Sequence, residues 1–387
     1  MHHDHAHIHH QLIHYFTNKE LDERYISVFF RTLAQSLISV FIPIYLYNLG
    51  FSLAKISIFF IIYFGLIPVY FPLCMQLTRL WGVKKTMAAG TVMLLVYYFF
   101  LHLISQGLPM YYAAVTFGIS VGLYYSAYHM DFAHTVKKEK GRTLGLFTAI
   151  AILANVAGPF IGSILINKYS FVLVFIISAI LCVISFMSLF FTPDYKLKNS
   201  HIQIIKAINS DTPQKAVVYM TAGCLGTIGG IFWPIFIFLT LDSVVSLGAI
   251  VSITSLFVAG AVILLGNASD KHGKWLYLAG TAAHAPTWIA RLFLLSPFGL
   301  LFSNVWSSLS FYAIDLSFAR QMYSSAQKKQ KNIANYFYFR EIFLESGRLI
   351  ILAFVVATMR LDLLFYVAAF VTLAYFILYT THVHKNP

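Results

Sequence analysis

Four ionisable residues lie close together in one otherwise apolar stretch of the sequence, residues 338–348. Glu341 and Glu345 are four residues apart, and Glu345 and Arg348 are three apart, so a helix would place all three on one face. If the stretch crosses a membrane, each charge costs at least about 2.5–3.5 kcal/mol, so such residues are normally paired or functional. We predict that Glu345 carries a proton, and a static ion pair between helices is the alternative. The other predicted proton-coupling residues are Glu341, Asp315 and Asp131.

The first ten residues contain a second group of reactive side chains, the imidazoles of six histidines. Alternating imidazoles on a polar segment can bind transition-metal ions weakly. The pattern predicts metal capture or sensing, and a solvated polar tail is the alternative; it does not make a metal the cargo. The predicted metal ligands are His2, His3, His5, His7, His9 and His10.

The composition places these residues in a membrane protein. Of the 387 residues, 59% are hydrophobic and 11% are charged, whereas soluble domains have about 25% charged residues. The net charge of +13 comes from small Lys and Arg clusters between apolar stretches, so no nucleic-acid partner is expected. The sequence contains no Walker A, HExxH or GxSxG pattern, so we predict neither an enzyme nor a cofactor.

Apolar stretches long enough to cross a bilayer recur about twelve times. They are 25–48, 53–77, 85–105, 109–133, 142–167, 170–191, 214–240, 244–266, 274–295, 297–321, 332–358 and 361–381. The predicted organisation is an N-terminal tail (1–24), a six-helix bundle (25–191), a cytoplasmic linker (192–213), a second six-helix bundle (214–381) and a C-terminal tail (382–387). Most lysines and arginines outside the spans fall on the side of the termini, which predicts that both termini are cytoplasmic.

The two halves of the sequence resemble each other. The segment 41–44 (FIPI) matches 232–235 (FWPI), and the loop at Gly82 matches the loop at Gly273 half a chain later. Such repeats are typical of duplicated transporter halves, so we predict an all-α polytopic protein made of two pseudo-symmetric bundles. Pro43 and Pro234 would bend equivalent spans at equal depth, either as passive kinks or as gates.

The loop after the eighth span resembles the signature of the major facilitator superfamily. That signature has a glycine, three residues, an aspartate, two residues, a glycine and a basic residue, here Gly266, Asp270, Gly273 and Lys274. The first-half copy has Arg79 where the family carries its acid. The resemblance implies alternating access, in which rocking of the bundles exposes a central site to each side in turn.

The resemblance also implies gating contacts. Asp270 would lie against the start of the fifth span, where Arg142 could add an ion pair and close the inner side. In that span, Gly145, Ala154, Gly158, Pro159, Gly162 and Ser163 are similar to the glycine pattern of the family's proton-coupled exporters, although packing alone could explain them. The predicted gating residues are Gly266, Asp270, Gly273, Lys274, Arg142, Gly158 and Pro159.

Spans one, four, seven and ten line the central cavity in this superfamily. The resemblance therefore implies that Arg31, Asp131 and Asp315 meet there, with Arg31 bridging carboxylates of different bundles as a gate that protonation releases; a fixed ion pair is the alternative. Aromatic rings would offer flat apolar faces with polar tips to a ligand. The predicted substrate-binding residues are Arg31, Gln35, Tyr124, Tyr125, Tyr128, His129, Trp233 and Arg348.

The sequence thus predicts a monomeric secondary transporter of a bacterial inner membrane that moves a small organic solute. Proton coupling is expected from the buried carboxylates, and the glycine pattern favours export by antiport. The first alternative is a proton-coupled importer of a metal ion or of an anionic metal chelate such as a siderophore. An alternative of another class is a non-transporting membrane sensor or a lipid-modifying enzyme.

Overall fold

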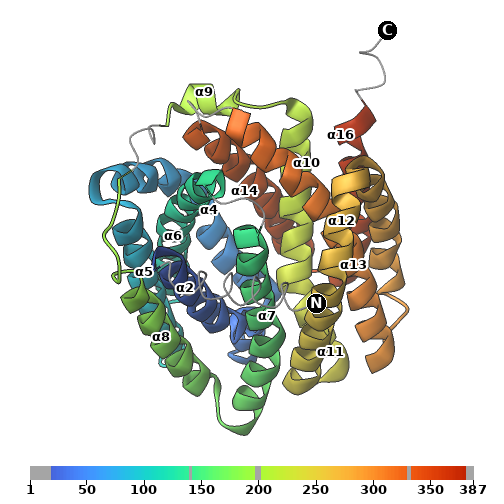
Figure 1. Ribbon diagram of the computed structural model, residues 1–387. Helices are drawn as coiled ribbons and strands as arrows, with labels where there is room; N and C mark the ends of the chain where they lie inside the picture. Colours follow the sequence, from blue (N-terminus) through green and yellow to red (C-terminus); the bar gives the residue numbers. More distant parts are fainter. Residues whose placement is uncertain (1–18, 139–141, 197–201, 329–332, 381–387) are drawn as a thin grey trace, which may run out of the picture.

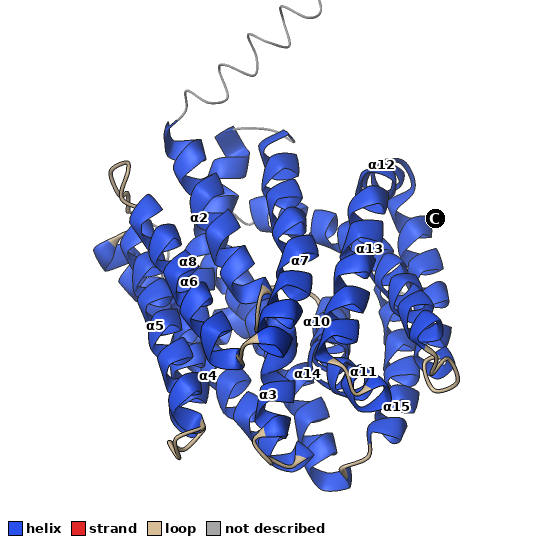
Figure 2. Ribbon diagram, turned by 90° about the horizontal axis from the view of Figure 1, so that it is seen from below, coloured by secondary structure: helices blue, strands red, loops and turns tan. Residues whose placement is uncertain are grey.

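The computed structural model describes residues 19–138, 142–196, 202–328 and 333–380 of the chain. Throughout these ranges every regular element is a helix, as Figure 2 shows. The first half contains α2 (Lys19–Ser36), η1 (Ser39–Phe41), α3 (Ile42–Asn48), α4 (Leu53–Trp81), α5 (Val83–Ile104), α6 (Tyr111–Lys138), α7 (Arg142–Lys168) and α8 (Phe171–Ser188). The short α9 (Ile204–Ile208) follows. The second half contains α10 (Pro213–Thr227), η2 (Ile228–Phe232), α11 (Trp233–Leu241), α12 (Val244–Ala290), α13 (Pro297–Lys328), α14 (Ile333–Thr358), α15 (Leu361–Leu373), η4 (Ala374–Phe376) and α16 (Ile377–Thr380).

These helices confirm the predicted all-α polytopic fold. Each predicted span corresponds to one helix, to a helix interrupted by a short break, or to one half of α12. The two halves of α12 meet at His272, whose φ of −136° and ψ of 36° are not helical. Within the described residues, eight segments are long and apolar enough to cross a membrane. The other predicted spans, α6, α13, α14 and the second half of α12, are less apolar because they contain buried polar and charged residues.

The two halves of the chain form two bundles that lie side by side in Figure 1, the first coloured blue to green and the second yellow to red. Small residues bring equivalent helices together in each bundle. A Cβ atom added at Gly162 of α7 would overlap the Leu37 carbonyl group beside α2. One added at Gly347 of α14 would likewise overlap the Met220 carbonyl group of α10. Close approach through small residues is how membrane helices pack without a hydrophobic driving force.

Two equivalent helices are broken at the same place. The first predicted span changes from α2 to the 3₁₀ turn η1 and then to α3, with Pro43 in the first turn of α3. The seventh changes from α10 to the π-helical η2 and then to α11, with Pro234 in the first turn of α11. Each proline thus follows a change of helix type, and it has no N–H to continue the helical hydrogen bonds.

The bundles also contact each other directly. In this description the terminal face is the one where α2 begins and α16 ends, and the opposite face is where α3 ends. Near the opposite face, Gly248 of α12 packs against Ser163 and against the Pro159 carbonyl group of α7. Nearer the terminal face, the rings of Phe71 (α4) and Tyr338 (α14) stack with centroids 5.8 Å apart.

The segment between the bundles is anchored to α14. The backbone N–H of Gln203 donates to Asn335 Oδ1 over 2.9 Å, and Ser210 Oγ donates to the Asn335 carbonyl over 3.3 Å. The helix α9 crosses the top of Figure 1 between these contacts. The predicted domain boundaries, including the linker 192–213, stay predictions.

Candidate functional site

A cavity of about 500 Å³ lies between the two bundles. The first bundle lines it with Ser36, Ser39, Val40, Ile152, Asn155 and Pro159. The second bundle lines it with Gly229, Gly230, Trp233, Pro234, Ile237, Val251, Thr254, Ser255, Val258, Asn304, Ser308 and Tyr312. The described lining residues are apolar or polar but uncharged. A cavity of this size, with apolar walls and several uncharged polar groups, suits a small organic ligand.

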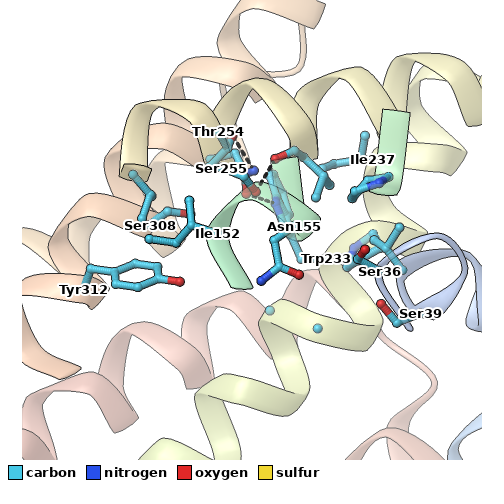
Figure 3. A pocket seen from close by; sticks show the side chains of 18 residues that line it. Ser36, Ser39, Ile152, Asn155, Trp233, Ile237, Thr254, Ser255, Ser308 and Tyr312 are labelled. Carbon is cyan, nitrogen blue, oxygen red and sulfur yellow. Dashed lines mark hydrogen bonds between the residues drawn. The ribbon is translucent and has the colours of Figure 1, made fainter. Parts of the chain in front are cut away.

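The two broken helices meet at this cavity. Ser39 lies in the 3₁₀ turn of the first, and Gly229 and Gly230 lie in the π-helical turn of the second. Single π-turns inside α-helices occur frequently at functional sites. Figure 3 shows Asn155 of α7 with Ser36 and Ser39 on one side and Tyr312 of α13 on the other.

Hydrogen bonds link three side chains on the cavity wall that the second bundle forms. Trp233 Nε1 donates to Asn304 Oδ1 over 2.9 Å, and Asn304 Nδ2 donates to Thr254 Oγ1 over 2.8 Å. Figure 3 shows Thr254 beside this part of the wall. All three side chains are buried, so these two hydrogen bonds fix the indole ring of Trp233 at the cavity surface.

A buried arginine lies behind this wall. The guanidinium carbon of Arg291 is 4.1 Å from the ring centroid of Trp233 and 4.1 Å from that of Trp288. Arg291 is 3% exposed, and its Nε and Nη1 atoms have no hydrogen-bond partner among the described residues. Trp288 Nε1 donates to His284 Nε2 over 3.2 Å, which fixes the second indole. The ring of Trp233 therefore separates the Arg291 cation from the cavity.

The predicted proton site lies on α14, away from the cavity lining. Glu345 is 1% exposed and accepts a hydrogen bond of 2.9 Å from Arg348 Nη1. Its second oxygen, Oε2, has no partner in the described part of the chain. The Arg348 guanidinium lies over the ring of Phe64 in α4, 4.4 Å from its centroid. Glu345 and Arg348 are thus an ion pair at the contact between the two bundles.

The neighbouring predicted carboxylates are arranged differently. Glu341 is buried and forms an ion pair with Arg340, the residue before it. Asp315 lies on α13, three residues after the cavity residue Tyr312, with an exposed side chain. The side chain of Asp131 is outside the described residues.

Arg31 is buried inside the first bundle. Its Nη1 donates to Thr91 Oγ1 of α5 over 3.0 Å, and its guanidinium carbon is 3.6 Å from the ring centroid of Tyr124 in α6. Tyr124 in turn stacks on Tyr128, with ring centroids 6.0 Å apart. In this structure the described residues show no ion pair between Arg31 and Asp315, so the predicted gate stays a prediction.

The remaining predicted substrate residues are only partly described. Gln35 is half-buried on α2, and Tyr125 is 37% exposed on α6. The side chain of His129 lies outside the described residues, and so do the six histidines of the N-terminal tail. Where the structure describes the chain, it contains no cluster of three potential metal-ligating side chains.

The signature loop of the second half forms an ion pair within its own bundle. Asp270 Oδ1 is 2.7 Å from Arg320 Nη1 of α13, and both side chains are more than half exposed. Lys274 lies over the ring of Tyr379, 5.7 Å from its centroid. A Cβ at Gly266 would meet nothing within 4 Å. The side chain of Arg142 is outside the described residues, so the contact expected between Arg142 and Asp270 also stays a prediction.

The equivalent loop of the first half, at Gly82, contacts a carboxylate that lies far away in the sequence. Asp194, after α8, accepts hydrogen bonds from the backbone N–H groups of Lys84 over 2.9 Å and Lys85 over 3.2 Å at the start of α5. A carboxylate at a helix N-terminus is favourable because of the free N–H groups and the helix dipole. Gly82 has φ +115°, and a Cβ there would overlap the Asp194 carboxylate.

The family model of the Major Facilitator Superfamily matches residues 25–339, most of the chain. The chain therefore belongs to the major facilitator superfamily. The fold agrees with that of solved members. A POT family transporter in complex with a thioalcohol-conjugated peptide superposes with a TM-score of 0.72 at 13% identity, covering 95% of this chain and 97% of that one. A POT family transporter in complex with 5-aminolevulinic acid gives a TM-score of 0.73 at 14% identity, with the same coverage. A search of curated proteins found no significant match.

For a member of this superfamily, the sequence identified only part of the cavity. Of the predicted site residues, Trp233 and Pro159 line it. The polar residues Ser39, Asn155 and Asn304 were not predicted, because uncharged side chains do not stand out among the many Ser, Thr and Asn of the spans. One signal was present: Ser39, Asn155 and Gly230 each stand four residues before a proline.

Proposed function

We propose that this protein is a secondary active transporter that moves a small organic solute across a membrane by alternating access, coupled to protons. The observation that carries this proposal is the cavity between the bundles, lined by residues of both halves. Rocking of one bundle against the other would open such a cavity to each side in turn.

The contacts between the bundles support this mode of action. Near the opposite face, α7 and α12 approach closely at Gly248, and α3 lies against α11. Near the terminal face, the carboxylate of Asp270 is exposed and paired within its own bundle. This arrangement fits a conformation that is closed at the opposite face and can open at the terminal face.

Glu345 is the best candidate for the proton carrier. A buried carboxylate costs free energy unless it is paired or protonated, and here one oxygen has a partner and the other does not. Its partner Arg348 touches α4 of the first bundle, so protonation would change a contact that the moving bundles share. A change in charge at such a contact can shift the balance between two conformations.

The proposal also includes the type of membrane, the orientation of the termini and the direction of transport. The basic residues at the terminal face support cytoplasmic termini in a bacterial inner membrane. The pattern Gly158, Pro159, Gly162 and Ser163 supports export by its similarity to that of the family's proton-coupled exporters, and Pro159 and Ser163 contact Gly248 of the second bundle. An importer of an anionic chelate would need basic groups on the cavity wall, and the described lining offers none.

Proton coupling can be tested in proteoliposomes that contain a pH-sensitive dye, with a solute first identified by its effect on Tm. The native protein should move protons when a solute gradient is applied, and Glu345→Gln should move solute without protons. Asp362→Asn, at an exposed carboxylate near the opposite face, is the matched control and should couple normally. Normal coupling by Glu345→Gln would overturn the proton assignment, and solute-independent leakage in all three proteins would overturn transport itself.

A further inference from the structure

Three prolines each remove the regular helical hydrogen bond to the carbonyl group of a residue that lines the cavity. In an α-helix the N–H of each residue donates to the carbonyl four residues earlier, and proline has no N–H. Pro43, Pro159 and Pro234 therefore leave the carbonyl groups of Ser39, Asn155 and Gly230 without this donor. The 3₁₀ turn η1 pairs the Ser39 carbonyl with the N–H three residues later, so Asn155 and Gly230 are the two without a regular helical donor. All three of these residues line the cavity.

The π-helical turn η2 frees one more carbonyl. The regular donor to the Gly229 carbonyl would be the N–H of Trp233, but that N–H donates to the Ile228 carbonyl instead. Gly229 and Gly230 have no side chains, and a Cβ at Gly230 would meet nothing within 4 Å. Both glycines line the cavity, so the Gly229 carbonyl lacks its regular helical donor at the cavity wall.

Other prolines inside helices do not have this relation to the cavity. Pro68 and Pro72 of α4 and Pro286 of α12 stand four residues after Phe64, Pro68 and Ala282. Within the described lining of the cavity, none of these residues appears. Among the described helices that line the cavity, a proline four residues after a lining residue thus occurs in the two broken helices and in α7.

Several hydrogen-bond donors of the cavity wall are used inside the protein. Ser36 Oγ donates to the Ala154 carbonyl over 2.9 Å, and Ser255 Oγ donates to the Val251 carbonyl over 2.9 Å. The indole N–H of Trp233 is bound to Asn304. These donors are therefore not available to a ligand, and a buried carbonyl acceptor without a partner is costly.

The lack of charged side chains on the described lining also limits which ligands the cavity can bind. An anion would face the oxygen atoms of these carbonyls with no basic side chain on the described lining. An organic cation would find no carboxylate on that lining, and the Arg291 guanidinium lies behind the Trp233 ring. An anion and an organic cation would each lose water in the cavity without gaining a counter-charge, which is unfavourable.

We propose that the cavity binds an uncharged organic solute through N–H or O–H groups that donate to the carbonyls of Asn155 and Gly230. This inference rests on the proposed function, because it assigns the solute class of the transport cavity. The ring of Trp233 and the side chains of Ile152 and Ile237 would hold the apolar part of such a solute.

The test uses the full-length protein in detergent and a fixed panel of small aryl compounds built as matched sets on several scaffolds. Each set has a neutral member with several N–H or O–H groups, the same compound with these groups methylated, a carboxylate and an ammonium derivative. Binding is measured by the rise in Tm and by quenching of tryptophan fluorescence. We expect the ligands to come from the neutral donor-bearing members, with methylation weakening binding at least tenfold.

Proline variants test the carbonyls themselves. Pro159→Ala restores the N–H that can bond to the Asn155 carbonyl, so it should weaken binding of the neutral ligands about threefold to tenfold. Pro68→Ala makes the same change in a helix away from the cavity lining and should leave affinity unchanged. If Pro159→Ala does not fold, Pro234→Ala tests the Gly230 carbonyl in the same way.

The outcomes separate this inference from the proposed function. Ligands found mainly among the charged or methylated members would overturn the inference while leaving transport intact, and so would a panel with no ligand. Neutral ligands that bind with the expected selectivity but show no flux in proteoliposomes would support the inference and overturn transport.

Discussion

Glu23 of α2 and Lys84 of α5 form a buried ion pair at the terminal end of the first bundle, with Nζ and Oε1 2.6 Å apart. Glu23 Oε2 also accepts hydrogen bonds from the backbone N–H of Thr192 over 2.8 Å and from its hydroxyl over 2.7 Å. The pair thus ties together three segments that are distant in the sequence.

Removing one partner of this pair should destabilise the protein more than removing both. Lys84→Met leaves the buried Glu23 carboxylate without its cation and should cost about 3–5 kcal/mol. The double variant Glu23→Gln with Lys84→Met should recover part of that loss. Thermal unfolding in detergent measures both, and a double variant less stable than Lys84→Met would contradict the argument.

Arg291 should determine which charges the cavity rejects. Arg291→Met keeps most of the side-chain volume between the two indoles but removes the cation, so organic ammonium compounds should bind measurably better. Arg291→Lys keeps the charge and should bind ammonium compounds as poorly as the native protein. Equal ammonium affinity in all three proteins, measured by tryptophan quenching, would show that Arg291 acts only in packing.

The helices in each bundle depend on glycine where two backbones touch. A Cβ at Gly223 of α10 would overlap the Leu344 carbonyl group of α14, whereas one at Gly226, three residues later, would meet nothing within 4 Å. These two positions share a helix and differ in their neighbours, so they separate helix propensity from packing.

Gly223→Ala should lower Tm because α10 and α14 must move apart, with a cost of about 1–3 kcal/mol for overpacking. Gly226→Ala should hold or raise Tm, since alanine favours the helix by up to about 1 kcal/mol over glycine. Both are measured by thermal unfolding in detergent. A larger loss of Tm at Gly226 than at Gly223 would contradict the packing found here.

The contact of Gly248 with α7 holds the two bundles together near the opposite face. Gly248→Leu should force them apart there and shift the population towards a state open at that face. Spin labels at Leu49 and Asp242, at the ends of α3 and α11, should then report a longer distance by pulsed electron resonance. Gly260→Leu, at an open position of the same helix, should leave the distance unchanged. A distance unaffected by Gly248→Leu would mean that the bundles do not pivot at this contact.

Much of the architecture could be predicted from the sequence. Apolar stretches of membrane length, the repeated FxPI pattern and the signature loop at Asp270 indicated a helical superfamily member with two related halves. These signals are local, because span length depends on bilayer thickness and a proline bends the helix in which it stands. The side chains of the charged residues are also conspicuous in sequence, which is why Glu345 and Arg348 were found as a pair.

The cavity wall could not be predicted in the same way. Ser39, Asn155 and Asn304 come from three different helices and are unremarkable in sequence, and they line one cavity only because η1, α7 and α13 are packed around it. The partner of a side chain was equally hidden: Asp194 caps α5 from beyond α8, and Arg31 rests on Tyr124.

The sequence by itself determined the all-helical fold, the duplication and the positions of the prolines, since each depends on residues within one span or on a repeat of such residues. Tertiary structure alone decided that the residues four positions before three prolines line one cavity, that Arg291 lies between two indoles, and that Asp270 pairs within its own bundle. These facts depend on which helix faces meet, and that is set by the combined packing of many small and large side chains across the membrane interior.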